Sequence, residues 1–384
     1  MNRRWYQNIN WAQINWKVTL FIIGLPIVTA LTLPFYLSHF GFSWTIWLFA
    51  ILFAGATTLS ITAGYHRLFS HRSYDANPLV RFFFLLIGAS AFQNSALKWS
   101  SDHRVHHSKV DTDEDPYNIH KGFWYAHMGW LFLELPTDHK PNAIDLERDP
   151  LIAFQHRHYL PIAFFVGFIA PALIGLLLGD WIGGLLVAGG LRIVLTQQTT
   201  FFVNSLCHLW GTQTYSDKVT ARDSLVVAVL THGEGYHNFH HLFQNDYRNG
   251  VRWYHWDPTK WLIKCMSLIG FAKRLRVVSN YEILRARLKM EELRMSSRGF
   301  STERLASIRE RILTTQAAMK RMRDDYVRLK SEMKSVSRIN EWNEASKAKL
   351  DQIKTDMQQK KIEFKQAWSE WKTCLRTAAI MIPN

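Results

Sequence analysis

The sequence predicts an all-α membrane protein with four transmembrane helices and a C-terminal coiled-coil-like helical hairpin. Two regions, residues 18–63 and 160–203, contain almost no charged side chains, although 20% of the residues in the whole chain are charged. Residues 281–384 have the opposite character, because they are highly charged and repeat apolar residues at heptad spacing. With 384 residues, the chain is long enough for one large domain or two ordinary ones.

Each uncharged region is long enough for two membrane spans of about 20 residues. We expect these spans at residues 18–38, 43–63, 160–179 and 181–203. The short turns within each pair contain no Lys or Arg, whereas the segments outside the pairs contain many. By the positive-inside rule, the N-terminus, the middle segment and the C-terminal tail are then cytoplasmic. The alternative is a pair of buried hairpins in a soluble protein.

Two further features belong to the apolar regions. Residues 79–97 form a fifth apolar stretch, which we expect to lie at the membrane interface or to fold back onto the other helices. If this stretch crossed the membrane, the histidines before it and those after it would lie on opposite sides of the bilayer and could not share a site. Arg192 lies inside the fourth predicted span. Because a charge within the membrane is costly unless it is bonded, we expect Arg192 to bond polar neighbours such as Gln197.

Residues 281–384 are expected to form a separate cytoplasmic domain, next to a membrane domain of residues 1–280. Their apolar residues form two segments, which begin at Leu305 and Leu350 and are separated by a break near Asn340. An antiparallel helical hairpin explains this pattern, and a dimeric coiled coil is the alternative. This tail has 23 Lys and Arg against 14 Asp and Glu, which accounts for +9 of the net charge of +15. In a chain with long apolar stretches, we expect this charge to face anionic lipid headgroups and not nucleic acid.

Eight histidines fall into three short motifs. One is an H-x4-H motif directly after the second predicted span, and two are H-x-x-H-H motifs. On a helix, positions i, i+3 and i+4 share one face, so each H-x-x-H-H motif is expected to offer three imidazoles to one point. The i, i+5 pair would lie about 140° apart on an ideal helix, which indicates that it straddles a helix end. The eight residues are His66, His71, His103, His106, His107, His237, His240 and His241.

Eight imidazoles exceed the four ligands of a zinc ion and suit two metal ions. Imidazole is a good ligand for iron, and none of the three cysteines belongs to the C-x-x-C pair of a zinc ribbon or an iron–sulfur site. Soluble di-iron bundles use two Glu-x-x-His motifs, but this chain has one, Glu234 to His237, flanked by glycines. The motifs therefore favour a histidine-rich di-iron site at the membrane surface.

A longer string of motifs carries a family resemblance. In chain order it comprises GYHRLFSH (64–71), SDHRVHH (101–107), DTDEDPYN (111–118), HMGW (127–130), NSLCHLWG (204–211), HGEGYHNFHH (232–241), DYRNG (246–250) and WYHWDPTKW (253–261). Over residues 15–275 the sequence resembles the membrane-bound fatty acid desaturases, specifically the acyl-CoA Δ9 (stearoyl-CoA) type. The resemblance implies four transmembrane helices below a cytoplasmic di-iron cap.

The resemblance also implies a set of iron ligands. It adds His208, in an N-S-x-x-H motif, as a ninth ligand, and it places Asn204 near the second iron through a water molecule. One iron is expected to take His66, His71, His103, His107 and His240, and the other His106, His208, His237 and His241. Acidic residues are candidates for orienting these rings, namely Asp102, Asp111, Asp113, Asp115 and Glu234.

The expected chemistry follows from the resemblance. An unactivated methylene C–H bond has no acidity and no leaving group, so side-chain acid–base catalysis cannot break it, whereas iron with O2 can. The reaction would use O2 and two electrons to remove two hydrogens from adjacent carbons of a fatty acyl-CoA, leaving a cis double bond at Δ9. The resemblance assigns Gln93, Trp99, Thr200 and Phe201 to the bend of the acyl chain, and Asn94 and Asp102 to the CoA headgroup.

Three alternatives stay open at this point. The first alternative is a desaturase that acts on acyl chains in phospholipid. It is suggested by Ser101, which stands where the family has an arginine near the CoA phosphates. A fatty acyl or alkane hydroxylase with similar histidine motifs is the second, and a non-catalytic membrane scaffold is the third. The sequence has no H-P-G-G motif of a cytochrome b5 domain. Electrons are therefore expected from a separate protein, a ferredoxin or cytochrome b5 with its reductase, which the basic cytoplasmic face would attract.

Overall fold

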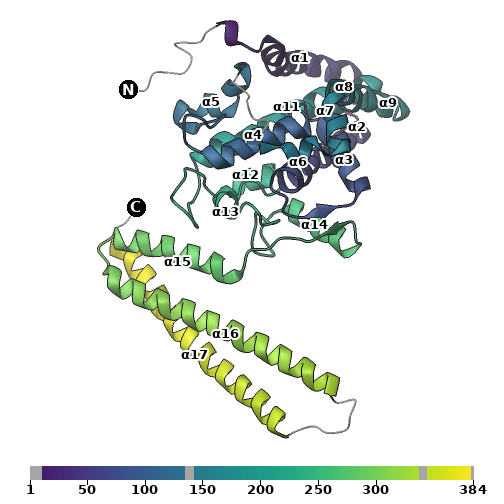
Figure 1. Cartoon of the computed structure of the whole chain (residues 1–384). Coiled ribbons are helices and arrows are strands. Elements are labelled where there is room, and N and C mark those ends of the chain that lie inside the picture. The colour runs from purple at the N-terminus through teal and green to yellow at the C-terminus, as the bar shows by residue number, and fades with distance from the viewer. Residues whose placement is uncertain (1–10, 135–141, 337–343, 382–384) are drawn as a thin grey trace. The chain divides into compact units, whose positions relative to one another are not determined.

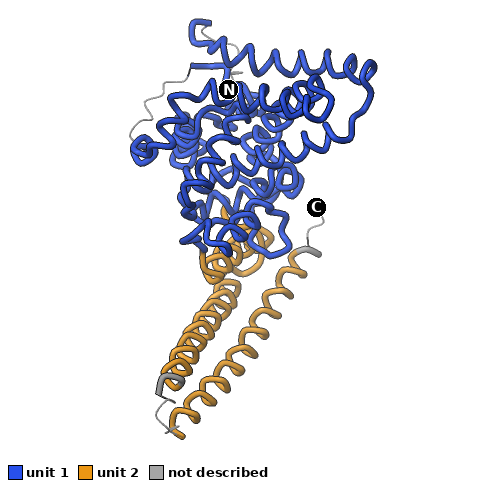
Figure 2. The backbone as a smooth tube through the Cα atoms, turned by 90° about the vertical axis from the view of Figure 1, so that its right-hand side faces the viewer, with its two compact units in different colours: residues 1–213, 217–277 blue, residues 214–216, 278–384 orange. Residues whose placement is uncertain are grey.

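The structure, a computed structural model, describes residues 11–134, 142–336 and 344–381. It is mostly helical (Figure 1) and divides into two compact units (Figure 2). Unit 1 comprises residues 1–213 and 217–277, and unit 2 comprises residues 214–216 and 278–384.

Unit 1 contains the histidine motifs and the apolar stretches. Its helical elements, in chain order, are η2 (Trp11–Gln13), α1 (Trp16–Phe40), α2 (Trp44–Leu59), η3 (Ser60–Ser70), α3 (Pro78–Ala89), α4 (Ala96–Lys109), η4 (Ile119–Lys121), α5 (Phe123–His127), η5 (Gly129–Phe132), α6 (Ile144–Glu147), α7 (Pro150–Arg157), α8 (Tyr159–Phe164), η7 (Phe165–Ile169), α9 (Ala170–Leu177), α10 (Trp181–Gly183), η8 (Gly184–Leu191), α11 (Arg192–Ser205), η9 (Leu206–His208), α12 (Leu225–Leu230), α13 (His237–Leu242) and α14 (Pro258–Leu268).

A small sheet accompanies these helices. The strands β1 (Asp75–Ala76) and β2 (Ala272–Lys273) pair antiparallel, with Asp75 opposite Lys273. The all-α prediction did not include them, because two-residue strands are too short to leave an alternating pattern in the sequence.

Three helices of the described residues are long and apolar enough to cross a membrane. They are Trp16–Phe40, Trp44–Ser70 and Tyr159–Leu177, and they coincide with the first three predicted spans. The fourth predicted span, residues 181–203, is helical as α10, η8 and α11 but is not among these three. Its lower hydropathy comes from Arg192 and the polar residues that follow it in α11.

The stretch 79–97 does not form one long helix. Its helix α3 has 12 residues, which gives a length of about 18 Å, whereas the hydrocarbon core of a bilayer is about 30 Å thick. The chain then turns through residues 90–95 into α4. This segment therefore does not cross the membrane as a single helix, and its place at the interface stays a prediction.

Three helices of unit 1 begin with the same local signal. Asn77, Asp149 and Asp257 each precede a proline, and each side chain accepts a hydrogen bond from a backbone amide in the first turn of α3, α7 or α14. Such caps give hydrogen-bond acceptors to backbone amides that have none within the helix. Proline has no N–H, so at the first helical position it leaves no amide without an acceptor. These short motifs fix where the three helices start.

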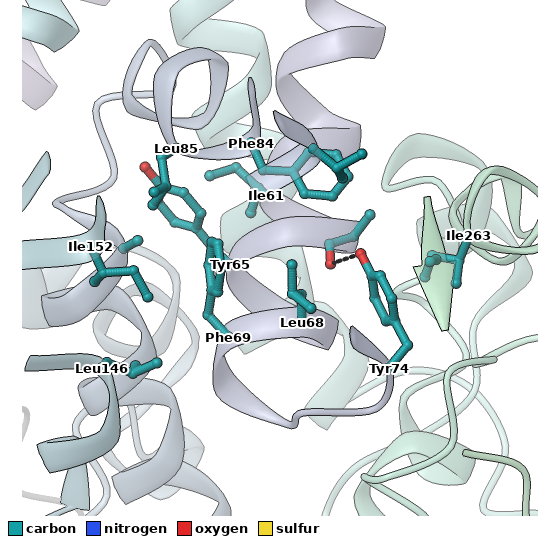
Figure 3. Close-up of a cluster of buried hydrophobic side chains, with 14 of the residues drawn as sticks. Ile61, Tyr65, Leu68, Phe69, Tyr74, Phe84, Leu85, Leu146, Ile152 and Ile263 are labelled. Carbon is teal, nitrogen blue, oxygen red and sulfur yellow. Dashed lines mark hydrogen bonds between the residues drawn. The ribbon is translucent and has the colours of Figure 1, made fainter. Parts of the chain in front are cut away.

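The main apolar core of unit 1 packs around η3 (Figure 3). Tyr65 of η3 clusters with Phe84 of α3 and Ile263 of α14. The hydroxyl of Tyr74 donates a hydrogen bond of 2.8 Å to the carbonyl of Ala63. The core therefore holds the segment that carries the first histidine motif from several sides.

Small residues allow α9 and η8 to pack closely. A Cβ atom built on Gly175 would lie 2.5 Å from the carbonyl oxygen of Asp180 and 2.7 Å from the Cα atom of Gly184. Both are backbone atoms, which cannot move aside cheaply. Contacts of this kind between small residues are typical of helix pairs in membranes.

In the described residues, unit 2 consists of α15 (Asn280–Ser296), α16 (Thr302–Val336) and α17 (Glu344–Met381). Helices α16 and α17 lie side by side in Figures 1 and 2, and Arg311 pairs with Glu370 at 2.8 Å. Leu288 of α15 joins the buried core around Trp371, so a third helix completes what the heptad pattern predicted as a hairpin. The break near Asn340 lies outside the described residues, and coiled-coil geometry stays a prediction.

The glycine contact between α9 and η8 yields a stability prediction. Gly175→Ala is expected to destabilise the protein by about 1–3 kcal/mol, because the added methyl group overlaps backbone atoms. The matched control is Gly24→Ala in α1, where nothing lies within 4 Å of the added Cβ and alanine only favours the helix. Thermal unfolding of both variants in detergent measures the difference. Equal unfolding temperatures would contradict the close packing.

Candidate metal centre

Nine histidines of unit 1 converge into two groups. Within each group, the possible ligand nitrogens all lie within 4.8 Å of one another. The resemblance suggested the same nine residues, in the same two sets, as ligands of two irons, and that role remains a proposal. The first group is His66, His71, His103, His107 and His240, and the second is His106, His208, His237 and His241.

The nitrogen positions fit metal ions. The Nε2 atom of His240 lies 3.0 Å from those of His66 and His107, and the Nε2 atoms of His237 and His241 are 3.0 Å apart. An ion with metal–nitrogen bonds of about 2.1 Å holds neighbouring ligand nitrogens about 3 Å apart. Each neutral imidazole has a single N–H, so four or five rings directed at one point cannot all satisfy each other. The donor set suits first-row transition metals such as iron.

The first histidine motif comes together because the helix that carries it is π-helical. Residues 60–70 form η3, in which the amide of His71 donates to the carbonyl of His66 at 3.1 Å. The ring centroids of the two histidines are 4.8 Å apart. The pair straddles a helix end as expected, because His71 directly follows the last residue of η3. The angle of about 140° applies only to an ideal α-helix, whereas i→i+5 bonding places residues five apart about one turn from each other.

Each H-x-x-H-H motif serves both groups. In both motifs the i and i+4 histidines belong to one group and the i+3 histidine to the other. The expectation that one motif aims three imidazoles at one point is therefore wrong. On a helix, i+4 is rotated by about 40° from i in one sense and i+3 by about 60° in the other. The helices α4 and α13 thus each contribute to two neighbouring centres.

Acceptors behind the rings fix two tautomers. An oxygen of Glu234 lies 2.7 Å from Nδ1 of His66, and an oxygen of Asp115 lies 2.9 Å from Nδ1 of His106. A proton held on Nδ1 by a carboxylate leaves the lone pair of Nε2 free for a metal. These two acids were candidates from the sequence, and they reach the histidines.

A hydroxyl orients a third ring. The Oγ1 atom of Thr220 lies 2.7 Å from Nδ1 of His208 and donates to Asp111 at 2.6 Å. Asp111 was a sequence candidate, whereas Thr220 carried no signal. The other two candidates do not bond a histidine of either group in the described structure: Asp102 pairs with Lys98 at 2.5 Å, and Asp113 is exposed.

Glu234 is held by a buried network that the sequence did not reveal. Arg67 lies 2.9 Å from Glu234 and 3.0 Å from Asp257, and the amide nitrogen of Asn249 donates to Glu234 at 2.7 Å. Burial opposes the charge of Glu234, but Arg67 and His66 outweigh it and lower the pKa of this carboxyl. The network explains why motifs late in the chain, around residues 246–261, support the first histidine motif.

The grouped histidines lie in an environment that keeps imidazole neutral. Burial, followed by neighbouring charged groups, lowers the pKa well below its usual range in all seven rings for which a shift is resolved. Neutral imidazole is the form that binds metals. These residues are His71, His103, His107, His208, His237, His240 and His241.

An apolar cavity of about 290 Å³ adjoins the histidines. His66, His103 and His237, one from each motif, contribute to its wall. The Nε2 atom of Gln93 donates to Thr200 at 3.0 Å. All six residues expected to bind substrate line this cavity, as does Asn204. They are Gln93, Asn94, Trp99, Asp102, Thr200 and Phe201.

The cavity also contains residues that the sequence did not indicate. Among the described residues that line it, Lys17 at the start of α1 is the only Lys or Arg, and Tyr117 and Tyr159 contribute polar groups. A single lysine next to an apolar helix gives no motif that would single it out.

A second, polar cleft of about 420 Å³ reaches the first group of histidines from residues that do not line the apolar cavity. His71 and His107 form part of its wall. Asp145 lies 2.7 Å from both Arg72 and Arg104, so positive charge remains in excess. Besides the two histidines, the cleft is lined by Ser70, Arg72, Arg104, Ser108, Asn142, Gln244, Asn245 and Arg276.

Comparisons with known proteins agree with this geometry. The family model described as fatty acid desaturase matches residues 42–265. The probable acyl-CoA desaturase of Schizosaccharomyces pombe is 46% identical over 285 residues, which cover 73% of this chain and 58% of that protein. Acyl-CoA desaturase 1 of Saccharomyces cerevisiae is 40% identical over 297 residues, or 77% of this chain and 57% of that protein.

A mammalian relative is also similar. Stearoyl-CoA desaturase of Homo sapiens is 36% identical over 255 residues, which cover 63% of this chain and 69% of that protein. The chain spans less than two thirds of the length of the two yeast relatives. The family match nevertheless covers more than half of this chain and includes all nine grouped histidines. The chain therefore belongs to the fatty acid desaturase family.

Proposed function

We propose that the protein desaturates a long-chain fatty acyl-CoA and introduces a cis double bond at Δ9. The observation that carries this proposal is an apolar cavity whose wall includes histidines from two metal-binding groups. A site for an apolar chain beside a redox metal centre suits the removal of hydrogen from an unactivated carbon. The names of the relatives, acyl-CoA and stearoyl-CoA desaturases, support the same substrate class.

Iron is the metal that we propose for both groups, with the nine histidines as ligands and Asn204 near the second iron through water. When bound, the two irons would supply the O2 chemistry that side chains lack. In the net reaction the acyl chain loses two hydrogens, and O2 takes these with two electrons and two protons to form two water molecules.

The residues of the chain contribute position and exclusion of water. Trp99 stacks on His103 with ring centroids 4.9 Å apart, and the bond between Gln93 and Thr200 closes part of the cavity wall. A carbon held beside the first group no longer has to find the oxidant by diffusion, an effect worth up to about 7–11 kcal/mol in well-oriented reactions. Neutral imidazoles and the paired Glu234 keep the ligand geometry fixed.

Acyl-CoA is favoured over acyl lipid by polar residues in the cavity lining, because Asn94, Asp102 and Lys17 offer partners for a headgroup. Ser101 bonds Asn142 at 2.8 Å and supplies no charge. Arg104, three residues further along α4, pairs with Asp145 at 2.7 Å. The acyl-lipid alternative therefore rests on the loss of one charge, which Lys17 offsets in our proposal.

We further propose four membrane crossings, with residues 181–203 as the fourth. Because α9 and η8 pack as neighbours through Gly175 and Gly184, a crossing by α8 to α9 implies a return through η8 and α11. The distribution of Lys and Arg then puts the N-terminus, the histidine groups and residues 281–384 on the cytoplasmic side. The division into a membrane domain of residues 1–280 and a basic tail remains part of this proposal.

Electrons are proposed to come from a separate one-electron carrier, a ferredoxin or cytochrome b5. The polar cleft beside His71 and His107 is a suitable approach, because its arginines favour a carrier with an acidic surface.

Lipid analysis tests the reaction. In a host that lacks its own desaturase but has a general electron donor, we expect a new cis Δ9 monoene that appears first in the acyl-CoA pool. Mass spectrometry locates the double bond and follows the pools at early times. First appearance in phospholipid would favour the acyl-lipid alternative, and a hydroxylated chain would redirect the chemistry.

The metal assignment predicts the behaviour of His66→Ala. The variant should insert into the membrane normally but lose iron and at least about 100-fold in turnover, since even indirect ligand partners contribute about 10–100-fold. The matched control is His158→Ala, which removes an exposed imidazole outside both groups. Iron content and product yield are measured on both purified proteins. Full activity of His66→Ala would contradict a metal site at this position.

The proposed carrier site predicts the effect of charge reversal in the cleft. Arg72→Glu combined with Arg276→Glu is expected to raise the KM for the reduced carrier about tenfold and to weaken its salt dependence. Iron content should not change. Lys264→Glu and Lys273→Glu reverse the same charge at exposed positions outside the cleft and serve as the control. An equal effect of both pairs would show that net charge alone matters and would remove the cleft as the docking site.

A further inference from the structure

We propose that the turn of residues 90–94, clamped to α11 by Arg192 and Gln197, sets which carbon–carbon bond of the acyl chain is desaturated. This inference rests on the proposed function, because it names residues that determine specificity in the same cavity. Phe92, Gln93 and Asn94 of the turn line that cavity.

The turn has an unfavourable backbone. Phe92 has φ 53° and Asn94 has φ 74°, values in the left-handed region that residues other than glycine seldom adopt. Such strained conformations are kept only where surrounding contacts impose them, and they are concentrated at functional sites. The contacts that impose this conformation therefore point to what the turn does.

Two buried side chains of α11 hold the turn by its carbonyl groups. The Nε2 atom of Gln197 donates to the carbonyls of Ala91 and Phe92 at 3.3 and 3.1 Å. Arg192 donates to the carbonyl of Ser90 at 3.2 Å. Arg192 bonds polar neighbours, as the sequence led us to expect, but Gln197 is not one of the partners found for it and bonds the turn itself.

Arg192 also ties the turn to two other helices. It donates to the hydroxyl of Thr57 in α2 at 3.2 Å and to the carbonyl of Gly167 in η7 at 3.3 Å, and its guanidinium lies over the ring of Phe53, 4.3 Å from the centroid. In the described structure its bonding partners are carbonyls and hydroxyls, not carboxylates. A charge within a predicted span is costly, so its use as a joint between α2, η7 and the turn indicates that their relative position matters.

The opposite side of the turn is fixed by a ring in a tight space. Phe92 stacks on Phe21 of α1, with centroids 4.8 Å apart, and meets Phe164 of α8 edge-on at 5.8 Å. A Cβ atom on Gly167 would lie 2.5 Å from Cε2 of Phe92. Glycine at position 167 is therefore required for the ring to occupy its place.

The clamped turn and the histidines face the same cavity. Gln93 bonds Thr200, and Thr200 lies on the face of α11 that also contains Arg192, Thr196 and Asn204 at steps of four residues. His66 and His103 of the first group line the cavity with the turn. A shift of the turn therefore moves the acyl chain along the cavity relative to the metal site.

Product analysis with a saturated C18 acyl-CoA tests the inference. Gln197→Met removes both bonds to the turn at similar volume, and Gly167→Ala displaces Phe92. Each is expected to raise the share of other double-bond positions about tenfold, which corresponds to about 1.4 kcal/mol between competing barriers. Thr199→Val is the matched control, because this hydroxyl bonds only backbone carbonyls of α11 in the described structure. Phe92→Leu in the Gly167→Ala background should restore the original position by making room.

The double-bond position separates positioning from stability. A loss of folded protein lowers the yield but cannot move the bond, so an unchanged position in active Gln197→Met and Gly167→Ala proteins overturns the inference. Loss of all product by both variants, with iron and substrate binding retained, also overturns it, since the turn would then serve turnover itself. No product from the unchanged protein counts against the proposed function on which the inference rests.

Discussion

The rest of the structure depends on one constraint, the clustering in two groups of nine imidazoles, of which seven are buried and two are partly buried. An unsatisfied buried polar group costs about 1–3 kcal/mol, so a metal ion on the inward nitrogens would remove much of the cost of burying this cluster. Glu234 and Asp115 supply partners directly, and Thr220 supplies one backed by Asp111. Because Arg67 and Asn249 fix Glu234 in turn, the last part of unit 1 is needed to complete the first histidine motif.

The same cluster separates two chemical environments. The apolar cavity and the polar cleft share no lining residue, yet each includes histidines of the first group. A long acyl chain would fill the cavity and leave no room for water there. Electrons, protons and product water then need another route, and the arginine-lined cleft beside His71 and His107 is the polar approach that the described residues offer. Separate access from two sides would keep the proposed substrate site dry while the proposed metal site stays in contact with the polar surface.

Features set by local composition were predictable from the sequence, and features set by contacts between distant residues were not. The three apolar spans and eight of the grouped histidines follow from runs and motifs in the sequence, and the family resemblance adds His208. Asn-Pro and Asp-Pro pairs also stand at the starts of α3, α7 and α14. The π-helix between His66 and His71 has no hydropathy signature that distinguishes it from an α-helix. Arg67 and Asp257 are 190 residues apart in the chain, and the partners of Arg192 lie on other helices. Helix α15 was not predicted from the sequence, because its charged residues interrupt the heptad pattern, although its Leu288 is fully buried.

The position of α11 connects the proposed substrate cavity to the proposed metal centre. Arg192 and Gln197 hold the strained turn, Thr200 bonds the cavity wall, and Asn204 faces the cavity near the second group. Along a helix, the 12 residue steps from Arg192 to Asn204 span about 18 Å with little freedom. The distance between the turn and the metal site is therefore set by a rigid element and not by a loop. An enzyme that must select one of many equivalent methylene groups has no chemical difference to recognise, and a fixed length is the property that can make the selection.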